Sequence, residues 1–86
     1  MRSYLIVGGS SDIGIILCRA LLEEGAAVTL LARDSSRLAE FPEGKVGKFI
    51  GDANDEELVK EAVLSAISAG NGRLDGVVHL VGSFAV

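Results

Sequence analysis

The sequence has little that would let it form disulfides, span a membrane or bind nucleic acid. A single cysteine among 86 residues allows no internal disulfide. No apolar run approaches the roughly 20 residues of a membrane-spanning helix. Twelve acidic residues outnumber eight basic ones, and no basic patch is available to displace counterions from a nucleic acid. Because internal repeats and low-complexity tracts are also lacking, the chain is expected to fold as an ordinary globular domain.

The length allows one small domain. Such a chain buries only a little over ~60% of its unfolded surface, so its stability is marginal and association of copies is a natural help. Hydrophobic residues make up 49% of the chain and aromatic residues 5%, which is typical of an aliphatic α/β core. The N-terminus runs from Met1 directly into apolar residues without a signal-peptide pattern, so we expect a cytoplasmic protein.

A strand, a glycine turn and a helix start follow one another near the N-terminus. Tyr4–Val7 suits a parallel strand covered on both faces, and Gly8 and Gly9 permit a tight turn. Oxygens that can cap a helix precede the apolar run Ile13–Leu22, on Ser10, Ser11 and Asp12. The first N–H groups of a helix have no intrahelical partner and lie at the positive end of its dipole. The sequence therefore predicts an anion site at this turn.

The spacing of this turn resembles that of the short-chain dehydrogenase/reductase family, whose pattern is Gly-x-x-x-Gly-x-Gly. Gly8, Asp12 and Gly14 occupy the three glycine positions, so the middle glycine is an aspartate here. The family places the pyrophosphate of a dinucleotide over this turn. The resemblance therefore implies contacts from Gly8, Ser10, Ser11, Ile13 and Gly14. We interpret Asp12 as a helix cap that points to water, although its carboxylate repels a pyrophosphate.

The first helix is predicted to lie close to the sheet. Gly14 and Cys18 are small residues one turn apart, and small side chains let a helix approach a strand layer. We therefore interpret Cys18 as a packing residue and not as a reactive thiol. Gly25 is expected to end the helix as a left-handed cap.

The second strand, Ala27–Ala32, is followed directly by Arg33. In nucleotide-binding α/β folds, an acid at the end of this strand bonds the ribose 2′-hydroxyl, while a nearby arginine accommodates a 2′-phosphate. Ala32 stands where the family has its acid, so the resemblance is to members that prefer NADP. Guanidinium suits phosphate because it donates two parallel hydrogen bonds. Ser35 and Arg37, in a predicted short helix before Pro42, could help; ordinary solvated charges are the alternative for both arginines.

The third strand, Val46–Ile50, ends beside Asp52 and Ala53. They match the family's Asp-Val position, whose aspartate bonds the adenine ring; an aspartate that only shapes a turn is the alternative. Asn54 and Glu57 form a capping-box pattern that predicts a helix from Asp55 to about Ala69. Gly70–Gly72 is expected to close this helix.

The segment Leu74–Gly82 predicts a fourth strand and its exit turn. By resemblance, the backbone of Gly82 would approach the cofactor ribose. His79 replaces an asparagine of the family pattern, and we interpret it as structural because no nucleophile or acid is placed to serve it. The family's catalytic serine and Tyr-x-x-x-Lys pair come from later elements. Tyr4 is the one tyrosine and lies in the first strand, so no catalytic residue is assigned. No residue is predicted to bind a metal.

The predicted fold is a three-layer α/β half-Rossmann domain spanning residues 1–86. Four parallel strands lie in the order 3-2-1-4, with the first two helices on one face and the third on the other. The strand Val77–Val81 would then be an apolar edge with bare flanks, and such edges invite pairing. We therefore expect copies to associate through this strand or the adjacent open face.

Three functions remain open at this point. The chain could be a truncated dinucleotide-binding module for NADP(H), with weak or absent binding and no catalysis of its own. It could be one half of an oxidoreductase completed by another chain, or an oligomeric structural remnant. A phosphate-accepting receiver domain is excluded because the first strand does not end in acidic residues. A P-loop is excluded because no Gly-Lys-Ser/Thr follows the turn.

Overall fold

The computed structural model describes residues 2–8, 12–33, 41, 46–52 and 54–80. Its elements, in chain order, are β1 (Ser3–Val7), α1 (Asp12–Glu23), β2 (Ala27–Ala32), β3 (Val46–Ile50), α2 (Glu56–Ala69) and β4 (Gly76–His79). Apart from Phe41, the short helix predicted before Pro42 lies outside the described residues. Within the described ranges, neither helix is long and apolar enough to cross a membrane.

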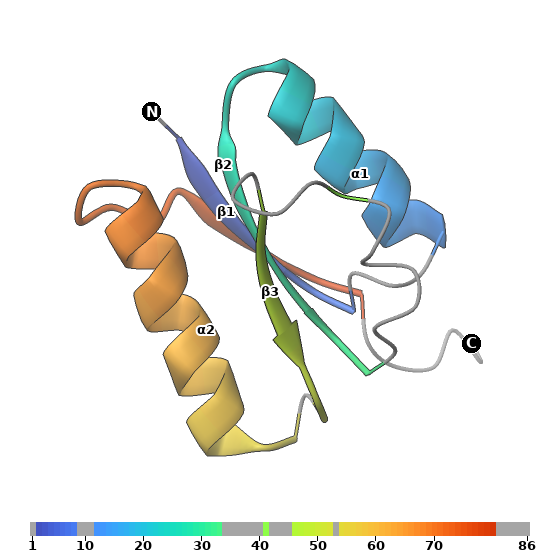
Figure 1. Cartoon of the computed structure of the whole chain (residues 1–86), viewed down its shortest axis with the longest axis vertical. Helices are drawn as coiled ribbons and strands as arrows, with labels where there is room; N and C mark the ends of the chain where they lie inside the picture. Colours follow the sequence, from blue (N-terminus) through green and yellow to red (C-terminus); the bar gives the residue numbers. More distant parts are fainter. Residues whose placement is uncertain (1, 9–11, 34–40, 42–45, 53, 81–86) are drawn as a thin grey trace.

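The strands form one parallel sheet in the order β3-β2-β1-β4, which confirms the predicted topology. Val7 is in register with Leu31 of β2 and with His79 of β4, and Leu31 is in register with Phe49 of β3. The carboxyl ends of all four strands therefore meet at one edge of the sheet. Figure 1 shows α1 and α2 on opposite sides of the sheet, so the described part has three layers.

Alternate residues of the strands divide the core between these two helices. On the α1 face, Ile6 and Leu30 are completely buried and pack with Cys18. On the α2 face, Leu5 and Leu31 pack against two alanines of α2 that are also completely buried, Ala62 and Ala66. Both faces of the central strands are thus covered, as their nearly continuous apolar sequence requires.

Helix α1 has the close packing and the left-handed end that its sequence predicts. Gly14 and Cys18 are buried. Burial raises the pKa of the Cys18 thiol to about 11, and the nearby positive charge of Arg19 lowers it only in part. Gly25 has φ +83°. Its N–H donates to the Leu22 carbonyl at 3.0 Å, which satisfies one of the last carbonyls of the helix.

Helix α2 begins one residue later than its sequence predicts. The cap is Asp55 and not Asn54, because one oxygen of the Asp55 carboxylate accepts the N–H groups of Glu57 at 3.1 Å and Leu58 at 3.2 Å. The N–H of Asn54 instead donates to the Asp52 carboxylate. Gly70 caps the other end, as expected.

The fourth strand is shorter than predicted. The expected strand was Val77–Val81, whereas β4 covers Gly76–His79, and Val81 lies outside the described residues. Leu80 still donates its N–H to the Val7 carbonyl at 2.7 Å, so the chain follows β1 for one residue past the strand. Val77 is 54% exposed on this edge strand. Neither helix therefore covers β4 completely.

Candidate nucleotide-binding edge

The glycine turn begins at Gly8, where β1 ends. Gly8 has φ +93°, a conformation that residues with a side chain rarely adopt. Its N–H donates to the Leu31 carbonyl at 2.7 Å, so the start of the turn is fixed against β2. Ser10 and Ser11, which the sequence places at the pyrophosphate, lie outside the described residues.

Helix α1 starts beside the carboxyl ends of the strands. Its first residue, Asp12, is exposed, as the sequence analysis expected. Ile13 is 58% exposed, whereas Gly14 is buried and brings the helix close to the sheet. The first N–H groups of α1 lie at this edge, where the helix dipole favours an anion.

Arg33 follows the last residue of β2 and has an exposed side chain. Ala32 before it is only 2% exposed, so a larger acid in its place would meet the packed core. Gly51 donates its N–H to the Ala32 carbonyl at 2.8 Å, which holds the end of β3 next to Arg33. Among the described residues, no acidic side chain forms an ion pair with Arg33.

Asp52 is exposed just beyond β3, and part of its role is to shape the turn into α2. Its Oδ1 accepts the Asn54 N–H at 2.8 Å, and its carbonyl accepts the Asp55 N–H at 2.9 Å. The turn interpretation of Asp52 therefore has direct structural support. The sequence signal of this bond is an aspartate two residues before the donor, the pattern of an Asx turn. Ala53 is outside the described residues.

His79, at the end of β4, is exposed and lies beside Val7 in the register. No group of three or more His, Cys, Asp and Glu side chains that could hold a metal occurs in the described part of the chain. Gly82, the predicted ribose contact, lies outside it.

One edge of the sheet therefore carries the described candidate residues. The start of α1 supplies backbone N–H groups, Gly8 begins the turn that leads to it, and the ends of β2 and β3 add a guanidinium and a carboxylate. The residues are Gly8, Ile13, Gly14, Arg33 and Asp52. Chemically, this edge can hold a phosphate group at the helix start and a second one near the guanidinium.

Comparison with known proteins gives a consistent result. The model of the NAD(P)H-binding family matches residues 8–81. An ipsdienol dehydrogenase from Ips pini is 41% identical over 81 residues, which are 94% of this chain and 31% of that protein. A 3-dehydrosphinganine reductase from Arabidopsis thaliana is 36% identical over 69 residues, 72% of this chain and 21% of that protein.

The fold agrees with solved structures as well. A short-chain type dehydrogenase/reductase from Mycobacterium ulcerans superposes with a TM-score of 0.80 at 31% identity, covering 95% of this chain and 33% of that one. The chain thus spans about a third or less of the length of these proteins.

Proposed function

Because the chain belongs to the NAD(P)H-binding, short-chain dehydrogenase/reductase family, we propose that it binds NADP(H) along the carboxyl edge of its sheet. The nicotinamide dinucleotide follows from the family, and the choice of NADP is our inference from Arg33. We assign the chain no independent catalysis, since the catalytic serine and Tyr-x-x-x-Lys pair of the family have no counterpart in its sequence.

The observation that carries this proposal is the meeting of the glycine turn, the start of α1 and Arg33 at one edge. The Gly8 N–H donates to the Leu31 carbonyl and the Ala32 carbonyl accepts the Gly51 N–H, so the first residue of the turn and the residue before Arg33 are fixed by the sheet. A preorganised site loses less entropy on binding. The net charge of −4 disfavours anions in general, so the attraction has to be local.

Each part of the cofactor has a proposed set of contacts. The pyrophosphate lies over the turn and the start of α1, the 2′-phosphate at Arg33, the adenine at Asp52 and Ala53, and the ribose near Gly82. The pyrophosphate contacts are Gly8, Ser10, Ser11, Ile13 and Gly14. Asp12 opposes the pyrophosphate by its charge, so binding is expected to be weak.

Calorimetric titration with NADPH and NADH at fixed moderate salt tests this assignment. We expect NADPH to bind at least about tenfold more tightly, a difference of about 1.4 kcal/mol. Arg33→Ala should remove the difference, because the 2′-phosphate then loses its partner. Arg73→Ala is the matched control, since Arg73 is exposed and pairs with Asp75 at 2.9 Å, by the start of β4. If neither nucleotide binds at millimolar concentration, the proposed cofactor site is wrong and the oligomeric structural role becomes the leading interpretation.

A second role is favoured by the open edge of the sheet. We propose that copies of the chain associate through β4 or the face beside it, because Val77 is 54% exposed on an edge strand that the described helices cover only in part. Sedimentation should show an assembly at micromolar concentration, and Val77→Lys should dissociate it. A stable wild-type monomer at that concentration would rule this association out.

A different chain could bind the β4 edge in place of a second copy. The protein would then supply the nucleotide site of an oxidoreductase whose catalytic residues come from that partner. Mixing the chain with a separately expressed catalytic part of a relative should then give NADPH-dependent turnover that neither part shows alone. The cytoplasmic location and the lack of a nucleic-acid partner stay predictions from the sequence, which fractionation and a binding assay can check.

A further inference from the structure

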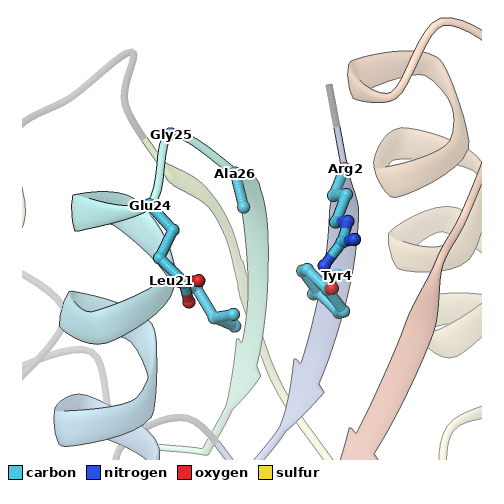
Figure 2. A pocket seen from close by; sticks show the side chains of 6 residues that line it. All are labelled: Arg2, Tyr4, Leu21, Glu24, Gly25 and Ala26. Atoms are coloured by element: carbon cyan, nitrogen blue, oxygen red, sulfur yellow. The ribbon is translucent and has the colours of Figure 1, made fainter.

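A pocket lies at the opposite, amino-terminal edge of the sheet. Figure 2 shows it between the last turn of α1 and the start of β1. Its volume is about 280 Å³, and it is lined by Arg2, Tyr4, Leu21, Glu24, Gly25 and Ala26. A strand rises about 3.3 Å per residue, so Tyr4 is roughly 13 Å from Gly8 along β1. This pocket is therefore separate from the proposed nucleotide site.

Backbone contacts hold the walls of the pocket in place. The N–H of Ala27 donates to the Arg2 carbonyl at 2.8 Å, which joins the start of β1 to the start of β2. The N–H of Ala26 donates to the Leu21 carbonyl at 3.0 Å and fixes the end of α1. A Cβ atom on Gly76 would lie 3.1 Å from the Tyr4 ring, so glycine there leaves room for the ring. These contacts define the walls of the cavity.

Two opposite charges face this cavity from different walls. Arg2 directly precedes β1 and Glu24 directly follows α1 (Figure 2). Among the described residues, the ion pair between Arg73 and Asp75 involves neither of them. An anion without a positive group would be repelled by Glu24, and a simple cation would be repelled by Arg2. A ligand that carries both charges satisfies both walls. Between them, the Tyr4 ring and Leu21 offer apolar contact.

The size of the cavity limits the ligand further. A cavity of about 280 Å³ is large enough for a small molecule such as a free amino acid and lies just below the usual range of sites for larger ligands. We propose that this pocket binds a free α-amino acid with an apolar side chain. Its carboxylate pairs with Arg2, its ammonium group with Glu24, and its side chain lies against Tyr4 and Leu21. An open site of this size is expected to bind in the millimolar range.

Titration of the ¹⁵N-labelled chain with L-leucine, followed by NMR, tests the proposal. Saturable shifts are expected at the amides of Tyr4, Gly25 and Ala26, with little change at Gly8. N-acetylleucine lacks the ammonium group and isoamylamine lacks the carboxylate, so each should bind more weakly than leucine. Equal affinity for all three compounds, or no saturable shift at tens of millimolar leucine, would overturn the proposal.

Variants of the two charged walls complete the test. Arg2→Gln and Glu24→Gln should each weaken leucine binding by about threefold to fivefold, the range of exposed charge pairs. Lys60→Gln and Glu61→Gln are matched controls, because both residues are exposed on α2 and away from this pocket. The same spectra report whether each variant is folded. Equal losses in the variants and the controls would also contradict the proposal.

Discussion

Alanine in place of either of two glycines at helix ends should destabilise the folded chain, for a different physical reason at each position. Gly70 has φ −96°, which any residue adopts, so its backbone does not require glycine. A Cβ there would collide with the Arg73 carbonyl oxygen and lie 2.6 Å from Cβ of Ser3. Ser3 is fully buried, and a backbone carbonyl cannot rotate away. At Gly25, with φ +83°, an added Cβ meets nothing within 4 Å.

We expect Gly70→Ala to lower the free energy of unfolding by about 1–3 kcal/mol, the usual range for overpacking a fixed site. Gly25→Ala should lower it by about 1–2 kcal/mol, because alanine is strained in the left-handed region. Asparagine tolerates that region, so Gly25→Asn should recover much of the loss, whereas Gly70→Asn should be at least as damaging as alanine. Urea denaturation followed by circular dichroism measures all four. A loss below about 0.5 kcal/mol for Gly70→Ala would refute the crowding argument.

Three further results are expected. Ser3→Ala should lower the free energy of unfolding, measured by urea denaturation, by about 1 kcal/mol, because the buried Ser3 hydroxyl donates to the Ala66 carbonyl at 2.6 Å. The loss is moderate because the Ala66 carbonyl also accepts a backbone N–H at 3.1 Å. A loss as large as that expected for a buried carbonyl with no hydrogen-bond donor at all would contradict this explanation. Asp55→Ala should cost about 1 kcal/mol of stability, whereas Asn54→Ala should cost almost nothing, if Asp55 is the cap. Cys18, with its pKa raised to about 11, should resist alkylation at pH 8 until urea unfolds the chain. Because the thiol has a pKa of about 11 in the folded chain and near 9 in the unfolded chain, its contribution to the free energy of unfolding is complete below pH 9 and is lost as the pH rises towards 11. Thermal melts across that pH range would detect this loss.

The sheet could be predicted from sequence because its signals are local. The bounds of β2 agree with prediction, since Gly25 ends the preceding helix and Arg33 interrupts the apolar run. The strand order follows from chain direction and the handedness of the crossovers. The cap of α2 was wrong by one residue because Asn54 and Asp55 both carry suitable oxygens. A turn bond from the Asn54 N–H to Asp52 decides between them.

Contacts between distant segments had no comparable signal. The sequence presents Ser3 as a residue before the first strand, yet its hydroxyl contacts the end of α2, 63 residues later. Its N–H donates to the Asp75 carboxylate at 2.8 Å, which ties the start of β1 to the start of β4. The pocket at Arg2 and Glu24 likewise forms only when the fold brings the end of α1 and the start of β1 to the same edge of the sheet. At the candidate site, the sequence predicts which edge Arg33 and Gly8 share, because parallel strands end together.

The most direct test of the proposed nucleotide site is NMR mapping of NADPH on the ¹⁵N-labelled chain. We expect saturable shifts at the amides of Gly8, Gly14 and Arg33, and little change at Gly25 on the opposite edge. Repeating the titration with NADH should leave the shifts near Gly8 and remove most of the shift at Arg33. Shifts confined to the amino-terminal edge, or none at millimolar NADPH, would contradict binding at the carboxyl edge.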